Sequence, residues 1–227
     1  MRKAIFWDFD GTLTFADHLW SRCLHQALGP LAGRLGIARE MLSAQLDKGF
    51  PWSPDGDPSL KGENWWPAMI PVFQRAYRQA GLPETQAAEA AKLVRAQVLR
   101  PEYYRVRPDA AATLAVCAYK GWKNYLLSNN FPELEEVLEA LGLRHFFAGI
   151  VNSGQLGLCK PDERIFRKAE LIAGFPSFIW MVGDNPTADI AGARQAGWHT
   201  AHIAKPGASS SGAEVTVSSL TELLKYL

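Results

Sequence analysis

Carboxylates, a lysine and a hydroxyl recur in this chain after short apolar runs, and together these groups could handle a phosphate. They are Asp8, Asp10, Asp184 and Asp189 on the acidic side, with Ser128, Asn129 and Lys160 as donors. Four carboxylates at one place repel one another strongly where the dielectric constant is low. A hard divalent cation would relieve that repulsion, and Mg²⁺ is the usual ion beside phosphates. The set therefore predicts Mg²⁺-assisted phosphoryl transfer, which depends on positioning and charge neutralisation.

The apolar runs before these groups predict the scaffold that positions them. Residues 4–8 form a short aromatic-rich run, typical of a strand that is buried on both faces. Similar runs, and helical patterns between them, lie at 124–127, 132–141, 149–151, 162–172, 178–182, 188–196 and 199–203. Alternating strands and helices predict an α/β fold, with a Rossmann-like parallel sheet and helices on both faces. The carboxyl ends of parallel strands lie at one edge, so the candidate groups could converge there.

The segment from residue 15 to residue 105 has a different pattern and contains no clear strand. Helical patterns cover 17–28, 38–47, 63–80 and 84–99, and residues 49–62 form a loop rich in Pro, Gly, Asp and Ser. We therefore expect an inserted all-helical cap domain at 15–105. Residues 1–14 and 106–227 would form the α/β core, with linkers near 14–17 and 103–108. A short flexible loop is expected at 208–212.

The bulk properties of the chain limit its function class. It has 227 residues and a formal net charge of +1, without the basic excess or basic stripe of a nucleic-acid binder. Its three cysteines show no metal-ligand spacing and no disulfide pattern, which favours reduced thiols in a cytoplasmic protein. No apolar stretch reaches the roughly 18 residues of a membrane span. We expect a monomer or homodimer that acts on a small phosphorylated metabolite, with no nucleic-acid or membrane partner.

Four motifs occur in an order that resembles the haloacid dehalogenase (HAD) superfamily. They are Asp8-Phe9-Asp10-Gly11-Thr12-Leu13-Thr14, Leu127-Ser128-Asn129, Lys160-Pro161 and Gly183-Asp184-Asn185-Pro186-Thr187-Ala188-Asp189. Their order and spacing match that family from about residue 3 to about residue 203. The insertion after the first motif resembles the family's helical, C1-type cap.

The resemblance implies a role for each matching residue. Asp8 resembles the nucleophile that forms an aspartyl-phosphate, and Asp10 resembles the general acid and base. The metal ligands would be a side-chain oxygen of Asp8, the backbone carbonyl of Asp10 and Asp184. Asp189 would orient these metal ligands. Ser128 and the Asn129 backbone N–H would hold phosphoryl oxygens, and Lys160 would neutralise the transferring group.

Each motif taken alone has a simpler interpretation. Asp-Gly is more often a turn than a catalytic site, and Gly183-Asp184-Asn185-Pro186 is typical of a loop with Asp184 or Asn185 as helix cap. Ser128-Asn129 and Lys160-Pro161 are weaker signals still. Only the ordered set, each member after a predicted strand, favours the functional interpretation.

The main functional prediction is a phosphatase of small phosphomonoesters. A phosphomutase of a sugar phosphate would use the same Asp8 and Asp10, and the sequence does not separate the two. A 2-haloacid dehalogenase is disfavoured, because that branch of the family does not keep the second aspartate of the first motif. One departure is Phe15, at a position where many relatives carry an acidic residue and where Asp17 is only a loose match.

Other residues invite weaker hypotheses. Of the adjacent Trp65 and Trp66, one is expected to pack inside the helical segment and the other to cover its boundary with the core. A substrate-facing aromatic is the alternative. Arg105 and Arg107 are expected at the surface, with contact to a substrate phosphate as the alternative. His199 and His202 are interpreted as structural.

Overall fold

The computed structural model describes residues 2–46, 48–204, 207, 209 and 211–227. Three sequence predictions extend beyond these residues. The core was expected to begin at Met1, the helix at 38–47 to end at Asp47, and the loop at 208–212 to include Ala208 and Ser210. These four residues lie outside the described part of the chain.

Six strands of the described chain form one parallel sheet in the order β3-β2-β1-β4-β5-β6. Their bounds are β1 Lys3–Trp7, β2 Trp122–Ser128, β3 Gly149–Asn152, β4 Phe178–Gly183, β5 His199–Ile203 and β6 Val215–Val217. Trp7 pairs with Leu126 on one side and with Val182 on the other. Asp8, Leu127 and Gly183, one residue further along, therefore reach the same level at the carboxyl edge. The predicted parallel α/β fold is confirmed.

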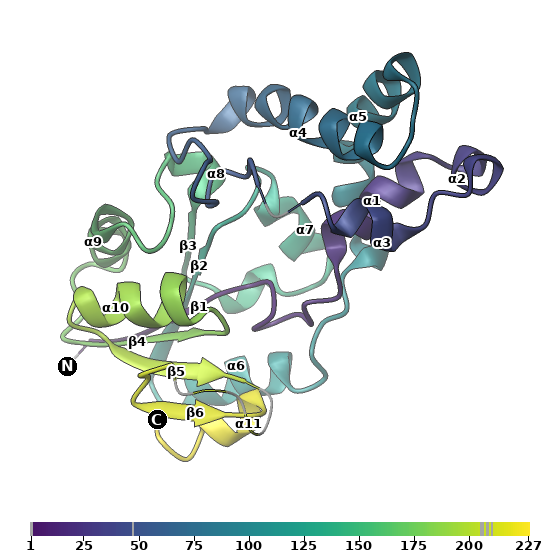
Figure 1. Cartoon of the computed structure of the whole chain (residues 1–227). Helices are drawn as coiled ribbons and strands as arrows, with labels where there is room; N and C mark the ends of the chain where they lie inside the picture. The colour runs from purple at the N-terminus through teal and green to yellow at the C-terminus, as the bar shows by residue number, and fades with distance from the viewer. Residues whose placement is uncertain (1, 47, 205–206, 208, 210) are drawn as a thin grey trace.

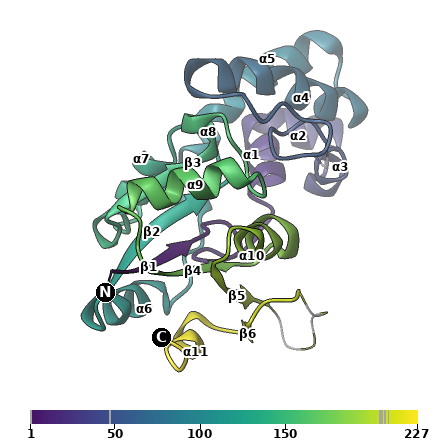
Figure 2. The same ribbon diagram turned by 90° about the vertical axis from the view of Figure 1, so that its left-hand side faces the viewer.

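Helices cover both faces of the sheet, because β1 presents apolar side chains alternately to each. Ala4 and Phe6 join a core cluster with α9 and α10, whereas Ile5 and Trp7 join a cluster with α6, α7 and α11. Figure 2 shows α9 and α10 on one side of the sheet and α6 and α11 on the other. Their bounds are α6 Ala110–Tyr119, α7 Leu134–Ala140, α8 Ser153–Leu156, α9 Glu163–Ile172, α10 Gly192–Gln195 and α11 Leu220–Leu223, with single turns η3 at Arg144–Phe146 and the π-helical η4 at Pro186–Ala191.

Between β1 and α6 the described chain is helical, apart from loops. Figures 1 and 2 show this segment gathered at one end of the molecule. Its elements are α1 Leu19–Ala27, α2 Pro30–Leu35, α3 Arg39–Ser43, η1 Gly62–Asn64, α4 Trp65–Gln79, α5 Glu84–Val98 and η2 Pro101–Tyr103. Trp20 is central to its core, where it packs on Trp65 at 6.1 Å and on Phe73 at 5.9 Å between ring centroids.

The chain enters and leaves this helical segment through two strands of backbone that lie side by side. Phe15 N donates to Arg105 O at 2.9 Å, and Arg107 N donates to Leu13 O at 2.9 Å. Between them, Thr14 and Val106 form an antiparallel bridge. The two predicted linkers therefore pair as a short two-stranded segment, formed by residues 13–15 and 105–107, which we call the stalk.

Several elements differ from expectation in extent. The predicted helix at 38–47 is only α3, and the predicted helix at 188–196 begins earlier, as η4, before it becomes α10. Asn185 explains that early start, because its side chain accepts hydrogen bonds from the Thr187 and Ala188 backbone N–H groups. The sequence analysis did not identify α2, α6, α11 or β6.

Two simpler expectations can be compared with the structure directly. Cys23, Cys117 and Cys159 are all buried, and none of them forms a disulfide within the described chain. Within the described residues, no helix combines the length and apolar character needed to cross a bilayer.

Candidate active site

Asp8 lies at the end of the central strand, where donors from two distant segments meet it. Ser128 Oγ donates to Asp8 Oδ1 at 3.0 Å, and Lys160 Nζ donates to the same oxygen at 2.8 Å. Asp8 is only 7% exposed. Both of these side-chain hydrogen bonds fall on one carboxylate oxygen, so the carboxylate is held in a fixed orientation.

Lys160 is the positive centre of the cluster. Besides Asp8, its ammonium donates to Asp189 Oδ1 at 2.5 Å and to the Leu127 backbone carbonyl at 2.8 Å. The Lys160 side chain is 2% exposed. Burial alone would lower its pKa, but the Asp189 and Asp8 carboxylates outweigh burial and raise it. Lys160 therefore remains protonated at neutral pH.

Two glycines allow the acidic side chains to approach the backbone. A Cβ on Gly11, where φ is +83°, would lie 2.1 Å from Asp184 Oδ2. A Cβ on Gly183 would lie 2.2 Å from Asp189 Oδ2. Any side chain at these positions would displace a carboxylate, so glycine is required at both.

Asp8, Asp184 and Asp189 form an acidic cluster that could hold a metal ion. Each offers a carboxylate oxygen, and these oxygens all lie within 4.8 Å of one another. Burial, followed by the charges of Asp8 and Asp189, raises the pKa of Asp184 to about 7. Without a cation, Asp184 is therefore close to half protonated at neutral pH, and its backbone carbonyl accepts from the His202 ring at 3.0 Å.

Asp10 lies beside Asp8 but has a different partner. Asn130 Nδ2 donates to Asp10 Oδ2 at 2.7 Å, and the Asn130 backbone N–H is itself fixed by Ser153 Oγ at 2.9 Å. Burial, followed by the charge of Asp8, raises the pKa of Asp10 to about 7. The two aspartates of the first motif therefore have different environments, and a carboxyl group with this pKa can both give and take a proton near neutrality.

Asn130 was missed by the sequence analysis. The signal was its position directly after the Ser128-Asn129 pair, although nothing in the sequence separated it from a turn residue. Asn129, which was predicted, is held by the backbone of Lys160. Its Oδ1 accepts from the Lys160 N–H at 2.8 Å, and its Nδ2 donates to the Lys160 carbonyl at 2.9 Å. The loops after β2 and β3 are thereby tied together.

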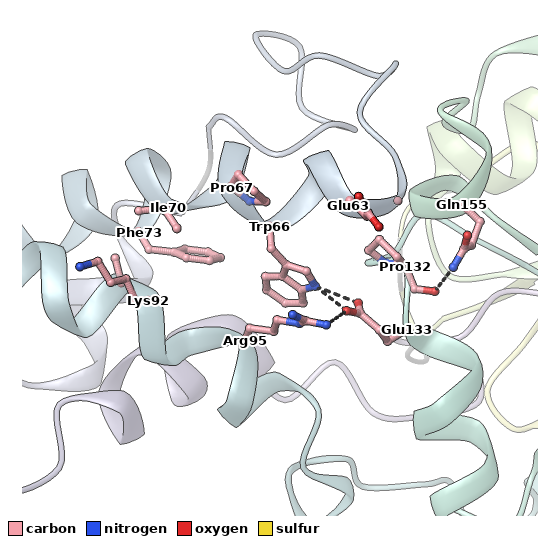
Figure 3. Close-up of a pocket in the computed structure, with 12 residues that line it drawn as sticks. Glu63, Trp66, Pro67, Ile70, Phe73, Lys92, Arg95, Pro132, Glu133 and Gln155 are labelled. Carbon is pink, nitrogen blue, oxygen red and sulfur yellow. Dashed lines mark hydrogen bonds and ion pairs between the residues drawn. The ribbon is translucent and has the colours of Figure 1, made fainter.

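A cavity of about 660 Å³ lies between the helical segment and the loop that follows Asn130. Figure 3 shows Trp66 of α4 pointing across it toward Glu133. Trp66 Nε1 lies 2.8 and 3.0 Å from the two Glu133 oxygens, and Arg95 of α5 reaches Oε1 at 2.6 Å. Trp65 is fully buried in the helical segment. The expectation that one tryptophan packs inside and the other covers the boundary is confirmed.

The two arginines near the second linker have different settings. Arg105 is exposed, as expected, and its guanidinium pairs with Asp17 at 2.6 Å. The surface prediction is wrong for Arg107, which is half-buried and donates to the Gly11 carbonyl at 3.1 Å. Arg107 therefore contacts the backbone of the first motif.

The sequence model of one family, described as haloacid dehalogenase-like hydrolase, matches residues 2–197. The chain belongs to this family. It is therefore a HAD-like hydrolase, and its parallel sheet with Asp8 at the end of the central strand is the scaffold on which the family's motifs are carried.

Two relatives and one solved structure illustrate the range of similar proteins. A haloacid dehalogenase-like hydrolase domain-containing protein 3 from Bos taurus is 34% identical over 90% of this chain and 82% of its own length. A phosphoserine phosphatase from Thermus thermophilus is 37% identical over 64% of this chain, a match that spans 59% of that relative. A 2-haloacid dehalogenase from Pseudomonas syringae superposes with a TM-score of 0.68 at 24% identity and covers 99% of this chain and 97% of its own. That last likeness concerns the fold alone.

Proposed function

We propose that this HAD-like hydrolase is a Mg²⁺-dependent phosphatase that hydrolyses a small phosphomonoester through an aspartyl-phosphate on Asp8. The observation that carries the proposal is the contrast between Asp8 and Asp10. Asp8 is oriented by the Lys160 ammonium and the Ser128 hydroxyl. Asp10, two residues on, has a pKa of about 7. Nucleophile and proton donor are therefore distinct groups.

The first step would be attack by Asp8 on phosphorus. Its Oδ1 is engaged by Lys160 and Ser128, so Oδ2 is the oxygen that would form the bond to phosphorus as the P–O bond to the leaving group breaks. Asp10, in its protonated form, would give its proton to the leaving oxygen. The resulting Asp10 carboxylate would then take a proton from the water that hydrolyses the aspartyl-phosphate, which restores both residues.

The chain offers suitable groups for the transferring phosphoryl group. Lys160 supplies a buried positive charge that is fixed by three oxygen partners. Ser128 is the last residue of β2, and Asn129 follows it directly and is fixed by two hydrogen bonds to the Lys160 backbone. These donors would stabilise the charge on the phosphoryl oxygens.

The residues also fit a Mg²⁺ ion. Three carboxylates, of which Asp8 and Asp189 are buried and Asp184 is partly exposed, surround one ammonium, and burial together with the charges of Asp8 and Asp189 raises the pKa of Asp184. Asp189 is already occupied, since Oδ1 accepts from Lys160 and Oδ2 accepts from the Asn185 backbone N–H at 2.9 Å. The family resemblance assigns the ion to a side-chain oxygen of Asp8, the Asp10 backbone carbonyl and Asp184, and the two hydrogen-bond partners of Asp189 fit its expected role in orienting these ligands. A bound Mg²⁺ would neutralise charge on the phosphoryl group.

Residues 15–105 would serve as a cap over this site, with residues 1–14 and 106–227 as the core. Three features support that division: the paired backbone of Phe15 and Arg105, the all-helical segment between them, and the bond from Trp66 to Glu133 across the boundary. Movement about the two-stranded stalk would admit the substrate and then exclude water. We place the enzyme in the cytoplasm, as a monomer or homodimer.

Relatives named as phosphatases support phosphate chemistry over the alternatives. Besides the Thermus phosphoserine phosphatase, a glyceraldehyde 3-phosphate phosphatase from Methanothermobacter thermautotrophicus is 27% identical over 87% of this chain. Dehalogenases share the fold, but Asp10 and its fixed partner Asn130 supply a proton donor that phosphate ester cleavage needs. A mutase would use the same groups, and its product would be an isomeric sugar phosphate instead of inorganic phosphate.

The proposal is tested with Asp8→Asn. The wild type is expected to release phosphate from p-nitrophenyl phosphate only with Mg²⁺, and Asp8→Asn is expected to lose that activity while its circular dichroism stays unchanged. Asp57→Asn, an exposed aspartate in the 49–62 loop, is the control. Retained activity in purified Asp8→Asn would overturn the nucleophile assignment. Chloride release from 2-chloropropionate without phosphatase activity would favour the dehalogenase instead.

A further inference from the structure

A second cavity, of about 620 Å³, adjoins the acidic cluster at Asp184. Gly11 and Asp184 line it where it meets the catalytic loop. Phe15, Arg105 and Arg107 line it where it meets the stalk. The cavity therefore extends from Asp184 to the guanidinium groups of Arg105 and Arg107, and Asp17 also lines it.

Phe15 holds the two arginines together. The Arg105 guanidinium lies 4.0 Å from the Phe15 ring centroid, and the Arg107 guanidinium lies 4.8 Å from it. Cation–π contacts of this kind keep both groups in place. Phe15 thus places two guanidinium groups side by side, one of which is paired with Asp17.

The two arginines differ in how their charge is balanced. Arg105 forms a two-point contact with Asp17, at 2.6 and 2.8 Å. Arg107 donates to the Gly11 carbonyl, and among the described residues it makes no ion pair with a carboxylate. Its Nε is buried and has no hydrogen-bond partner there. A half-buried guanidinium with an unused donor favours binding of an anion.

An independent feature of the same cavity is His202. It is 4% exposed, and its Nε2 lies 3.0 Å from the Asp184 carbonyl, which can only accept. Nε2 must therefore carry the proton, so Nδ1 of the neutral ring is an acceptor. Nδ1 is buried and has no hydrogen-bond partner in the described chain. Two residues that line the cavity thus each carry a buried polar atom without a partner in the described chain, a donor on Arg107 and an acceptor on His202.

We propose that this cavity binds a second anionic group of the substrate, a carboxylate or a second phosphoryl group, through Arg107. Arg105 adds positive charge at its outer side, and His202 Nδ1 accepts from a substrate hydroxyl or amine. The inference rests on the proposed phosphatase function, because the first phosphoryl group occupies the site at Asp8. It narrows the substrate class to phosphomonoesters whose leaving group carries its own negative charge.

A purely structural role for Arg107 would have a different consequence. Arg107 touches the Gly11 carbonyl, so its loss could disturb the first motif for every ligand equally. Binding by Arg107, in contrast, favours only the ligand that carries the second anion. The ratio of affinities for two ligands that differ only in that group therefore separates the two roles.

The test measures binding of 3-phosphonopropionate and propylphosphonate by calorimetry with Mg²⁺ present. The wild type is expected to bind the carboxylate probe at least about tenfold more tightly, as a charge-assisted hydrogen bond contributes that much. Arg107→Gln is expected to remove the preference. Arg100→Gln, an exposed arginine paired with Glu102 outside the cavity, is expected to keep it. Comparison of the affinities for propane-1,3-bisphosphonate and 3-phosphonopropionate shows whether the cavity prefers a second phosphoryl group or a carboxylate.

Equal affinities in the wild type, or a preference that survives Arg107→Gln, would overturn the inference and leave the phosphatase proposal intact. Weak binding of both probes by an enzyme that hydrolyses p-nitrophenyl phosphate would overturn it too. If the wild type neither binds the probes nor hydrolyses that ester, the proposed function fails and this inference fails with it.

Discussion

The Lys160 ammonium lies 2.8 Å from Asp8 Oδ1, although 152 residues separate the two in sequence. The same ammonium lies 2.5 Å from Asp189 Oδ1, so a single buried cation holds two carboxylates. Neither Lys160 nor Asp189 is open to water, since their side chains are 2% and 1% exposed. Lys160 therefore has a structural function in the fold as well as its proposed function in phosphoryl transfer.

Lys160→Met is expected to destabilise the protein as well as inactivate it. The substitution leaves Asp8 and Asp189 buried without their cation, and removal of one partner from a buried pair costs about 3–5 kcal/mol. Urea unfolding measures this loss. Lys92→Met is the matched control, because Lys92 is 57% exposed and pairs with Glu89 at the surface, where a pair contributes less than about 1 kcal/mol. Equal, small losses in both variants would contradict the buried pairing.

Mg²⁺ is expected to stabilise the protein more at pH 8 than at pH 5.5. The pKa of Asp184 rises from 3.8 to about 7 on folding, so the metal-free fold loses stability as pH rises from about 4 through 7. The ionised carboxylate is also the form that binds a cation. At a Mg²⁺ concentration 100 times the Kd, binding would add about 2.7 kcal/mol at pH 8.

Thermal unfolding with and without Mg²⁺ measures this effect without any substrate. Asp184→Asn is expected to unfold at the same temperature in both conditions, because it lacks the charge that the ion would neutralise. The metal assignment fails if the shift is as large at pH 5.5 as at pH 8, or if it persists in Asp184→Asn.

Asp10→Asn is expected to slow the hydrolysis of esters with poor leaving groups more than that of esters with good leaving groups. An alkyl phosphate needs a proton on its departing oxygen, whereas p-nitrophenolate leaves readily without one. Loss of a general acid typically costs about 10²–10⁴ in rate. Comparison of kcat/KM for an alkyl and an aryl phosphate measures the difference, and Asn130→Ala, which removes the Asp10 partner, is expected to act in the same direction. Equal losses on both substrates would argue against an acid role.

Trp66→Phe is expected to loosen the boundary between the helical segment and the core. Phenylalanine keeps ring contact with Phe131 but cannot donate to Glu133, and a hydrogen bond to a charged group contributes about 1.5–3 kcal/mol. Hydrogen–deuterium exchange of α4 and α5 reports the change. Arg39→Gln, which removes an exposed ion pair with Glu40 on α3, should leave the exchange of α4 and α5 unaltered. Unchanged exchange in Trp66→Phe would show that this contact does not hold the segment.

The order of strands and motifs was accessible from the sequence, because buried parallel strands are continuous apolar runs and each polar motif follows one. That reasoning brought Asp8, Ser128, Lys160 and Asp184 to one edge of the sheet, and the structure places them there. Their distances, and the separate partners of Asp8 and Asp10, depend on side-chain packing that no sequence pattern records.

Other features of the fold and the site could not be predicted from a pattern in the sequence. Helix α6 is rich in Ala and apolar on most sides, so its periodicity indicates no buried face, and β6 has only three residues. From the sequence alone Arg107 would be placed at the surface, and only the fold brings its guanidinium to the Gly11 carbonyl. Asn130 and Glu133 acquire their partners only through the tertiary fold, which brings Asp10 and Trp66 to them.

Chemical trapping of the intermediate tests the central claim most directly. A phosphorylated aspartate is reduced by borohydride to homoserine, so an enzyme quenched during turnover and then reduced can be read by peptide mass spectrometry. With p-nitrophenyl phosphate, whose leaving group needs no acid, we expect homoserine at position 8, more of it in Asp10→Asn because the base for the second step is missing, and none in Asp8→Asn. Modification at another residue, or none at position 8 while phosphate is being released, would contradict it.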